Sequence, residues 1–199
     1  MHHFKNYFQV LSTPEFIQFF NLIRFFLMDN LDDIVEIKFK DFDLVSDIIY
    51  ESKLIDDKLL DKQNAALFIK NKMMRNKAKI FVKKHEDTFI AFILLYYKVN
   101  PLSAIHYNWH ISYLYVKPDC RRKYIASEIL EKCIDFASTT KVNHISLNTD
   151  ADNYPSHKLY ESFGFRRMNF IANYYYYELQ LTQELKINYK NKLYDKNIT

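Results

Sequence analysis

The chain has 199 residues, of which 49% are hydrophobic and 17% aromatic, and its formal net charge at pH 7 is +4. This composition can bury a sizeable core and excludes a globally disordered protein, and the length suggests one domain with terminal additions. The mild charge does not indicate a nucleic-acid binder. Cys120 and Cys133 form neither a metal pattern nor a disulfide framework, so we expect a protein of the reducing cytoplasm.

An apolar stretch at residues 14–28 follows a favourable helix start at Ser12, Thr13 and Pro14. The stretch is too short for a transmembrane span of about 20 apolar residues, and it contains polar and charged side chains. It also lacks the cleavage site of a signal peptide. We expect a helix that packs on the domain or against a second subunit in a homodimer. A helix that lies on a membrane surface is the alternative.

The chain then alternates predicted strands and helices. Residues 34–40 alternate apolar and polar side chains like a half-buried strand, and residues 42–77 are expected to form two helices. The core positions predicted within these helices are Leu59, Leu60, Leu67, Phe68 and Met73. Residues 79–86 and 89–99 form a predicted antiparallel hairpin. Its second arm is apolar on both faces, which is typical of a central strand.

The second half of the chain continues this alternation. Its predicted elements are a strand at 109–117, a helix at 121–138, a strand at 144–149, a helix at 155–163 and a strand at 169–181. No internal repeat or interdomain linker interrupts them. The predicted domain organisation is an N-terminal extension at 1–31, one α+β domain at 32–182 and a polar C-terminal tail at 183–199.

Gly164 is the one glycine of the chain, whereas an average usage of about 7% would give about 14. It lies in the run LYESFGF at residues 159–165. A glycine retained in such a glycine-poor sequence indicates a backbone position with positive φ. The left-handed residue that closes a helix is such a position.

The segment from 114 to 130 contains the first candidate site. A strand and a break lead to Arg121, Arg122 and Lys123 at the start of a predicted helix. Unpaired backbone N–H groups and the helix dipole favour an anion at such a point, and the placement suits a pyrophosphate group. A solvated basic helix end is the alternative interpretation of the same residues.

The segment from 153 to 165 contains the second candidate site. Asn153 and Pro155 begin a predicted helix, and Tyr160 lies further along it. A tyrosine hydroxyl group can act as a general acid. Taken alone, however, Tyr160 fits a core aromatic residue better than a catalyst.

Together and in this order, the two segments resemble motifs of the Gcn5-related N-acetyltransferase (GNAT) superfamily. The first resembles its acyl-CoA motif, a strand reading L-x-V-x-P followed by R/Q-x-x-G-x-G/A, with matches at Leu114, Val116, Pro118, Arg121 and Ala126. The second resembles the pattern N-x-x-A-x-x-x-Y-x-x-x-G-F, with matches at Asn153, Tyr160, Gly164 and Phe165, and with Ser156 in the alanine position. The resemblance implies a GNAT-like α+β fold: a central mixed, mostly antiparallel sheet flanked by helices, here with an added N-terminal helix.

The resemblance also implies an acyl-CoA-dependent N-acetyltransferase, with acetyl-CoA as cosubstrate, an amine as acceptor and no metal. Backbone groups of residues 114–116 would hold the pantetheine arm and the thioester. The N–H groups of residues 122–126 would hold the pyrophosphate, and Asn153 would contact the arm from the far side. The implied cofactor-binding residues are Leu114, Tyr115, Val116, Arg121, Arg122, Lys123, Tyr124, Ile125, Ala126 and Asn153.

The implied mechanism is direct attack of a neutral primary amine on the thioester carbonyl, with Tyr160 protonating the departing CoA thiolate. His110 is the candidate general base, because it occupies a strand position where relatives carry a glutamate and an unperturbed histidine pKa of about 6.5 suits the task. A His110 that only lines the groove, or that is buried and hydrogen-bonded, is the alternative. His106 lies four residues before His110, but the strand pattern argues against a helical metal site.

Tyr124 departs from the resemblance, because the family motif has glycine at this position. The tyrosine can present its backbone N–H to the phosphates if its side chain points away from them, or it can fill the site. The second outcome favours another function, a catalytically weak or inactive GNAT-fold module that binds partners. The sequence does not identify the acceptor, which can be an amine of a small molecule, a peptide or a protein.

Overall fold

The computed structural model describes residues 34–54, 62–99 and 107–184. The predicted helix at 14–28, the core candidates Leu59 and Leu60, His106 and most of the predicted tail lie outside the described residues. The described helices and strands, in chain order, are β1 (Ile34–Ile37), a 3₁₀ helix (Phe39–Val45), α3 (Ser46–Glu51), α4 (Lys62–Met74), β2 (Ala78–His85), β3 (Thr88–Val99), β4 (Tyr107–Val116), a 3₁₀ turn (Pro118–Cys120), α5 (Ile125–Ser138), β5 (His144–Asp150), α6 (Tyr154–Ser162), β6 (Arg166–Ile171) and β7 (Tyr174–Gln180).

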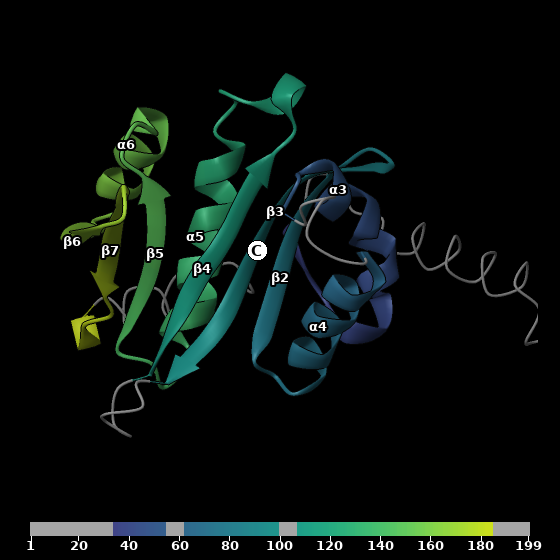
Figure 1. Cartoon of the computed structure of the whole chain (residues 1–199), viewed down its shortest axis with the longest axis horizontal. Helices are drawn as coiled ribbons and strands as arrows, with labels where there is room; N and C mark the ends of the chain where they lie inside the picture. Colours follow the sequence, from purple (N-terminus) through teal and green to yellow (C-terminus); the bar gives the residue numbers. More distant parts are fainter. Residues whose placement is uncertain (1–33, 55–61, 100–106, 185–199) are drawn as a thin grey trace, which may run out of the picture. The chain divides into compact units, whose positions relative to one another are not determined.

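The strands form one seven-stranded sheet in the order β1-β2-β3-β4-β5-β7-β6 (Figure 1). Every neighbouring pair is antiparallel except β4 and β5, which run parallel. Apolar side chains of β3, β4 and β5, among them Ile93, Trp109 and Ile145, share a buried core with α5 on one face. On the other face, α3 contacts β3 and α4 contacts β2. The predicted mixed, mostly antiparallel sheet flanked by helices is confirmed.

β3 is the central strand that its apolar sequence predicts. It pairs with β2 on one side and with β4 on the other, and residues 89–95 are all buried. The hairpin between β2 and β3 turns at Glu86 and Asp87, as predicted, with Glu86 at a φ of 51°.

The prediction of a single last strand at 169–181 is wrong. The structure has two strands here, β6 and β7, which pair antiparallel around a turn at Ala172 and Asn173. Both turn residues have positive φ, at 50° and 69°. A two-residue hairpin turn needs this left-handed backbone, which sequences usually supply with glycine. In this chain alanine and asparagine supply it, so the turn is hidden in the sequence.

The prediction that Leu67 and Phe68 are core residues is also wrong. Each is 55% exposed in α4, whereas Met73 is buried as predicted. Among residues 64–74 of this helix the buried pair is Ile69 and Met73, which are four residues apart and therefore lie on one side of the helix. Leu67 lies on its other side, and Phe68 stays largely exposed although its ring lies 6.2 Å from the ring of Tyr96 on β3.

β4 contains a β-bulge that changes which face of the sheet its later side chains point to. Leu94 of β3 is opposite Tyr113 and Leu95 is opposite Ile111, so Ser112 has no partner residue on β3. An extra residue reverses the alternation of side chains along a strand. Ile111 lies in the core beneath α5, and Leu114 packs against that same core, although an unbroken strand would turn these two residues to opposite faces.

β4 and β5 separate at this bulge. Their parallel pairing runs only from Asn108–His144 to Ile111–Leu147. Beyond that point the two strands diverge toward the end of the sheet where α6 and the first turn of α5 lie (Figure 1). The edge of residues 112–116 that faces β5 therefore has no strand partner.

Gly164 has a φ of +85° and follows the end of α6. Its N–H donates to the Glu161 carbonyl, and the N–H of Phe165 donates to the Tyr160 carbonyl. This is the left-handed helix end that the lone glycine predicts, and the prediction is confirmed. In the part of the chain that the structure describes, no helix combines the length and the apolar character needed to cross a membrane.

Candidate active site

A cavity of about 710 Å³ lies where β4, the start of α5 and α6 meet. Most of the residues that the sequence proposes for cofactor binding or catalysis line it: Leu114, Tyr115, Val116, Arg121, Arg122, Tyr124, Ile125, Ala126, Asn153 and Tyr160. Lys123 and His110 do not line it. The volume lies within the range of about 300–1,000 Å³ that is typical of sites for small molecules and cofactors.

The loop before α5 turns its backbone toward the cavity by an unusual conformation. The predicted helix start at 121 is four residues too early, because Arg122 and Tyr124 have φ values of 63° and 62° and α5 begins at Ile125. Tyr124 is the residue before the helix, and its side chain is 81% exposed. A left-handed backbone at this point is what the glycine of the family motif would adopt without strain. Tyr124 keeps that conformation and directs most of its side chain to solvent.

The N–H groups at this helix start remain available. No described residue accepts a hydrogen bond from the backbone N–H groups of residues 122–126, and no side chain caps the helix. The first N–H groups of a helix lack partners within the helix, and together with its dipole they favour an anion. The exposed side chains of Arg122 and Lys123 add positive charge beside them.

Arg121 ties this loop to β4. Its Nε donates to the Val116 carbonyl at 3.0 Å, which joins the helix start to the last residue of the strand. The guanidinium group of Arg121 thus has a structural partner in addition to lining the cavity.

α6 forms the opposite wall. Asn153 precedes the helix and its Oδ1 accepts a hydrogen bond from the Ser156 N–H at 3.3 Å, so its side chain acts as a helix cap. Tyr160 lies two turns further on and is only 7% exposed. Burial, and then the nearby Cys133, raise the pKa of Tyr160, which keeps its hydroxyl group protonated at neutral pH and above.

His110 lies deeper in the sheet, on the stretch where β4 still pairs with β5. It is 7% exposed, and its Nδ1 is 2.8 Å from Oγ of Ser146 on β5. Ser146 also accepts a hydrogen bond from the amide of Asn108. Burial, followed by the charge of Lys98, lowers the pKa of His110 to about 4. This pKa lies below the value of about 6.5 that would suit a general base, so His110 is uncharged at neutral pH.

Sequence reasoning did not select five further residues that line the cavity: Cys120, Ser127, Pro155, Ser156 and Leu159. Helix periodicity offers a signal for some of them, because Ser156 and Leu159 lie on the same side of α6 as Tyr160. Within the described residues, no group of three or more His, Cys, Asp and Glu side chains is arranged to hold a metal ion.

The comparison with protein families decides what kind of domain this is. The profile of the acetyltransferase (GNAT) family matches residues 39–165, which include the whole cavity. The chain belongs to the GNAT acetyltransferase family. Among curated proteins, none matches the sequence.

Solved acetyltransferase structures share the fold. The chain is 25% identical to a probable acetyltransferase, with a TM-score of 0.59, over 71% of this chain and 95% of that one. It is 21% identical to an N-acetyltransferase from Staphylococcus aureus Mu50, with a TM-score of 0.61, over 77% and 100% of the two chains. It is 15% identical to yncA, a putative acetyltransferase from Salmonella typhimurium solved with acetyl-CoA, with a TM-score of 0.61, over 77% and 96%. The last two likenesses concern the fold alone.

Proposed function

We propose that this GNAT chain transfers an acetyl group from acetyl-CoA to a primary amine of a small molecule, a peptide or a protein. The observation that carries the proposal is that three groups suited to acetyl-CoA border the same cavity. The unpartnered N–H groups at the start of α5, the unpaired edge of β4 and the hydroxyl-bearing Tyr160 all border it. Each suits a different part of acetyl-CoA: the pyrophosphate, the extended arm and the sulfur.

The N–H groups of residues 122–126 are our candidates for binding the pyrophosphate, with Arg122 and Lys123 adding charge. The unpaired edge of residues 114–116 is our candidate for binding the pantetheine arm, because an extended amide chain can pair with a strand edge. Asn153 would contact the arm from α6. The 81% exposure of Tyr124 supports this assignment, since the tyrosine side chain leaves its own N–H group accessible.

Acetyl-CoA supplies a thioester whose carbonyl carbon is attacked directly by a neutral amine, giving an amide and the CoA thiol. Tyr160 would donate its hydroxyl proton to the departing sulfur, and its raised pKa keeps that proton in place before the reaction. Preorganised N–H groups would stabilise the negative charge that develops on the carbonyl oxygen.

The proton lost by the amine needs an acceptor. His110 stays our candidate, and its uncharged state at neutral pH leaves it able to accept a proton. A pKa of about 4 makes it a weak base, however, and it does not line the cavity. Transfer to His110 would therefore run through water, with bulk solvent as the final acceptor.

The alternative function is a GNAT-fold module that binds a partner with little or no catalysis. Tyr124 in the glycine position of the family motif is the feature that favours it. A homodimer through residues 14–28, a cytoplasmic location and the lack of a nucleic-acid partner stay predictions from the sequence.

Thermal unfolding with acetyl-CoA tests the proposal first, with CoA as a second ligand and ATP as a control. A ligand at 100 times its Kd stabilises a folded chain by about 2.7 kcal/mol. We expect a raised melting temperature with acetyl-CoA and CoA but not with ATP. An absence of any shift at millimolar acetyl-CoA would refute the proposal.

A second measurement separates the two functions. Release of free CoA thiol is followed while acetyl-CoA is incubated with a panel of primary amines, including polyamines and lysine-containing peptides. Amine-dependent thiol release supports the transferase. Binding without release from any amine of the panel supports the binding module.

A further inference from the structure

Two residues of α6 are buried, and one of them is polar. The nine-residue helix buries only His157, at 3% exposure, and Tyr160, at 7%. They are three positions apart and thus lie on one side of the helix. The attachment of α6 to the sheet therefore depends strongly on the contacts of His157.

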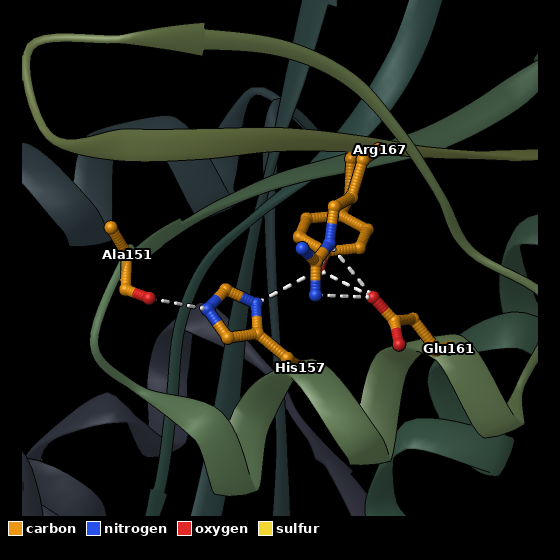
Figure 2. Close-up of polar contacts among 5 residues, drawn as sticks. Ala151, His157, Glu161 and Arg167 are labelled. Carbon is orange, nitrogen blue, oxygen red and sulfur yellow. Dashed lines mark hydrogen bonds and ion pairs between the residues drawn. The ribbon is translucent and has the colours of Figure 1, made fainter.

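Both ring nitrogens of His157 have partners outside α6 (Figure 2). Nε2 lies 3.1 Å from the carbonyl oxygen of Ala151, in the segment that connects β5 to the helix. A carbonyl oxygen can only accept a hydrogen bond, so Nε2 carries a hydrogen and donates it. Nδ1 lies 2.8 Å from the hydroxyl oxygen of Tyr177 on β7. One imidazole ring thus fixes α6 to two separate elements.

The hydroxyl group of Tyr177 is held from further directions. Arg167 of β6 donates to it from Nε at 2.7 Å, and the hydroxyl lies 3.0 Å from Oε1 of Glu161. Arg167 also forms an ion pair with Glu161 at 2.8 Å (Figure 2). His157 and Glu161 are four residues apart on α6, so two successive turns of the helix face the Tyr177 hydroxyl group, whose one hydrogen can be donated to only one of them at a time.

Tyr177 connects this network to Tyr160. Its side chain is fully buried, with 0% exposure, and its ring centroid is 6.2 Å from that of Tyr160 and 5.8 Å from the ring of His157. The Tyr177 ring thus packs beside Tyr160. A rotation of α6 would move Tyr160 relative to the cavity, and the His157–Tyr177 hydrogen bond opposes that rotation. An apolar side chain of similar size could fill the space of His157 but could not fix the angle.

We propose that His157 is a positioning residue, which holds Tyr160 at the cavity through its hydrogen bonds to Tyr177 and Ala151. His157 does not line the cavity, so we assign it a role through the orientation of α6 and not through contact with a bound molecule. The inference rests on the proposed function, in which the Tyr160 hydroxyl meets the sulfur atom of CoA.

The test compares binding of CoA with binding of desulfo-CoA, which lacks the sulfur atom, by isothermal titration calorimetry. A hydrogen bond of about 1 kcal/mol between Tyr160 and the sulfur makes CoA bind about fivefold more tightly than desulfo-CoA. Tyr160→Phe should make the two affinities equal, so that the ratio falls to about one. His157→Leu and Tyr177→Phe should both reduce it to less than about twofold, while the Kd for desulfo-CoA changes by less than about threefold.

Two further variants complete the design. Lys158→Ala changes an exposed residue of the same helix and should leave the ratio unchanged. His157→Gln keeps a donor for the Ala151 carbonyl and should retain part of the ratio. If His157→Leu does not fold, Tyr177→Phe decides the test, because it keeps the buried ring and removes only the hydroxyl group.

The outcomes distinguish the two proposals. If the unaltered chain binds neither ligand, the proposed function fails and the inference fails with it. If Tyr160→Phe abolishes the ratio but His157→Leu and Tyr177→Phe leave it at its original value, the positioning role alone is overturned. A loss of thermal stability in these variants with an unchanged ratio has the same meaning, since His157 would then serve the fold and not Tyr160.

Discussion

Replacing Tyr124 with glycine should stabilise the protein, although it removes a large aromatic side chain. The side chain is 81% exposed, so little packing is lost. Its φ of 62° and ψ of 2° place an L-residue in the left-handed region, which costs about 1–2 kcal/mol. Glycine relieves that cost but loses about 0.5–1 kcal/mol more conformational entropy on folding. The midrange values of these two effects, about 1.5 and about 0.75 kcal/mol, leave an expected net gain of about 0.75 kcal/mol.

Thermal unfolding followed by circular dichroism measures this gain. For a domain of this size, 1 kcal/mol corresponds to about 2–4 °C, so Tyr124→Gly should raise the melting temperature by about 1–4 °C. Tyr124→Ala is the matched control, because it removes the same aromatic ring but keeps the β-carbon and the strain. Tyr154 offers a second control. It is 69% exposed at the start of α6, and its replacement with glycine should lower the melting temperature.

The comparison of the two Tyr124 variants is decisive. If Tyr124→Gly melts at or below the temperature of Tyr124→Ala, the left-handed strain is absent and the reasoning is refuted. If the glycine variant is more stable, the acetyl-CoA titration can be repeated on it. An unchanged acetyl-CoA affinity would show that the tyrosine side chain does not obstruct the pyrophosphate position.

Two other predictions concern the candidate catalytic residues. Tyr160→Phe should lower kcat, measured by thiol release, by about 100-fold, while the Kd for acetyl-CoA, measured by calorimetry, stays within about threefold of its original value. An unimpaired kcat would remove Tyr160 from the mechanism. The folded pKa of His110, about 4, lies below the unfolded value of about 6.5, so the unfolded chain binds the proton more readily. The free energy of unfolding therefore falls as the pH drops from 6.5 to 4. Between pH 8 and pH 5 the free energy of unfolding of the unaltered chain, measured by urea titration, should fall by about 2 kcal/mol more than that of His110→Gln. Equal losses in the two proteins would show that His110 is not buried in its uncharged form.

The sequence predicts the sheet well where burial sets the pattern. β3 has apolar residues on both faces because both faces are buried. α5 has apolar residues at four-residue spacing because one side of the helix packs on the sheet. The predicted helix at 155–163 and Gly164 at its end are likewise fixed by local rules of helix termination. These elements need no knowledge of distant residues, and the prediction of each agrees with the structure within a few positions.

The wrong predictions concern positions where the residue type does not indicate the backbone conformation. The turn at Ala172 and Asn173 separates two strands without glycine or proline, so the sequence from 169 to 181 shows no signal of a turn and resembles one continuous strand. The late start of α5 has the same cause, since Arg122 and Tyr124 adopt left-handed angles in place of glycine. The low pKa of His110 depends on its burial in the sheet and then on the charge of Lys98 of β3, and no local sequence pattern reports either.

The positive φ angles also explain why Gly164 is the one glycine in the chain. At seven described positions a residue other than glycine has positive φ, with values between 50° and 69°: Lys53, Asn76, Glu86, Arg122, Tyr124, Ala172 and Asn173. These values lie within or at the edge of the left-handed region of about +50° to +70° that L-residues can occupy. Gly164 has a φ of +85°, beyond that region, although a β-carbon there would meet only the Leu179 side chain at an ordinary 3.6 Å. Backbone angle, and not space, therefore separates the position that keeps glycine from the seven that do not.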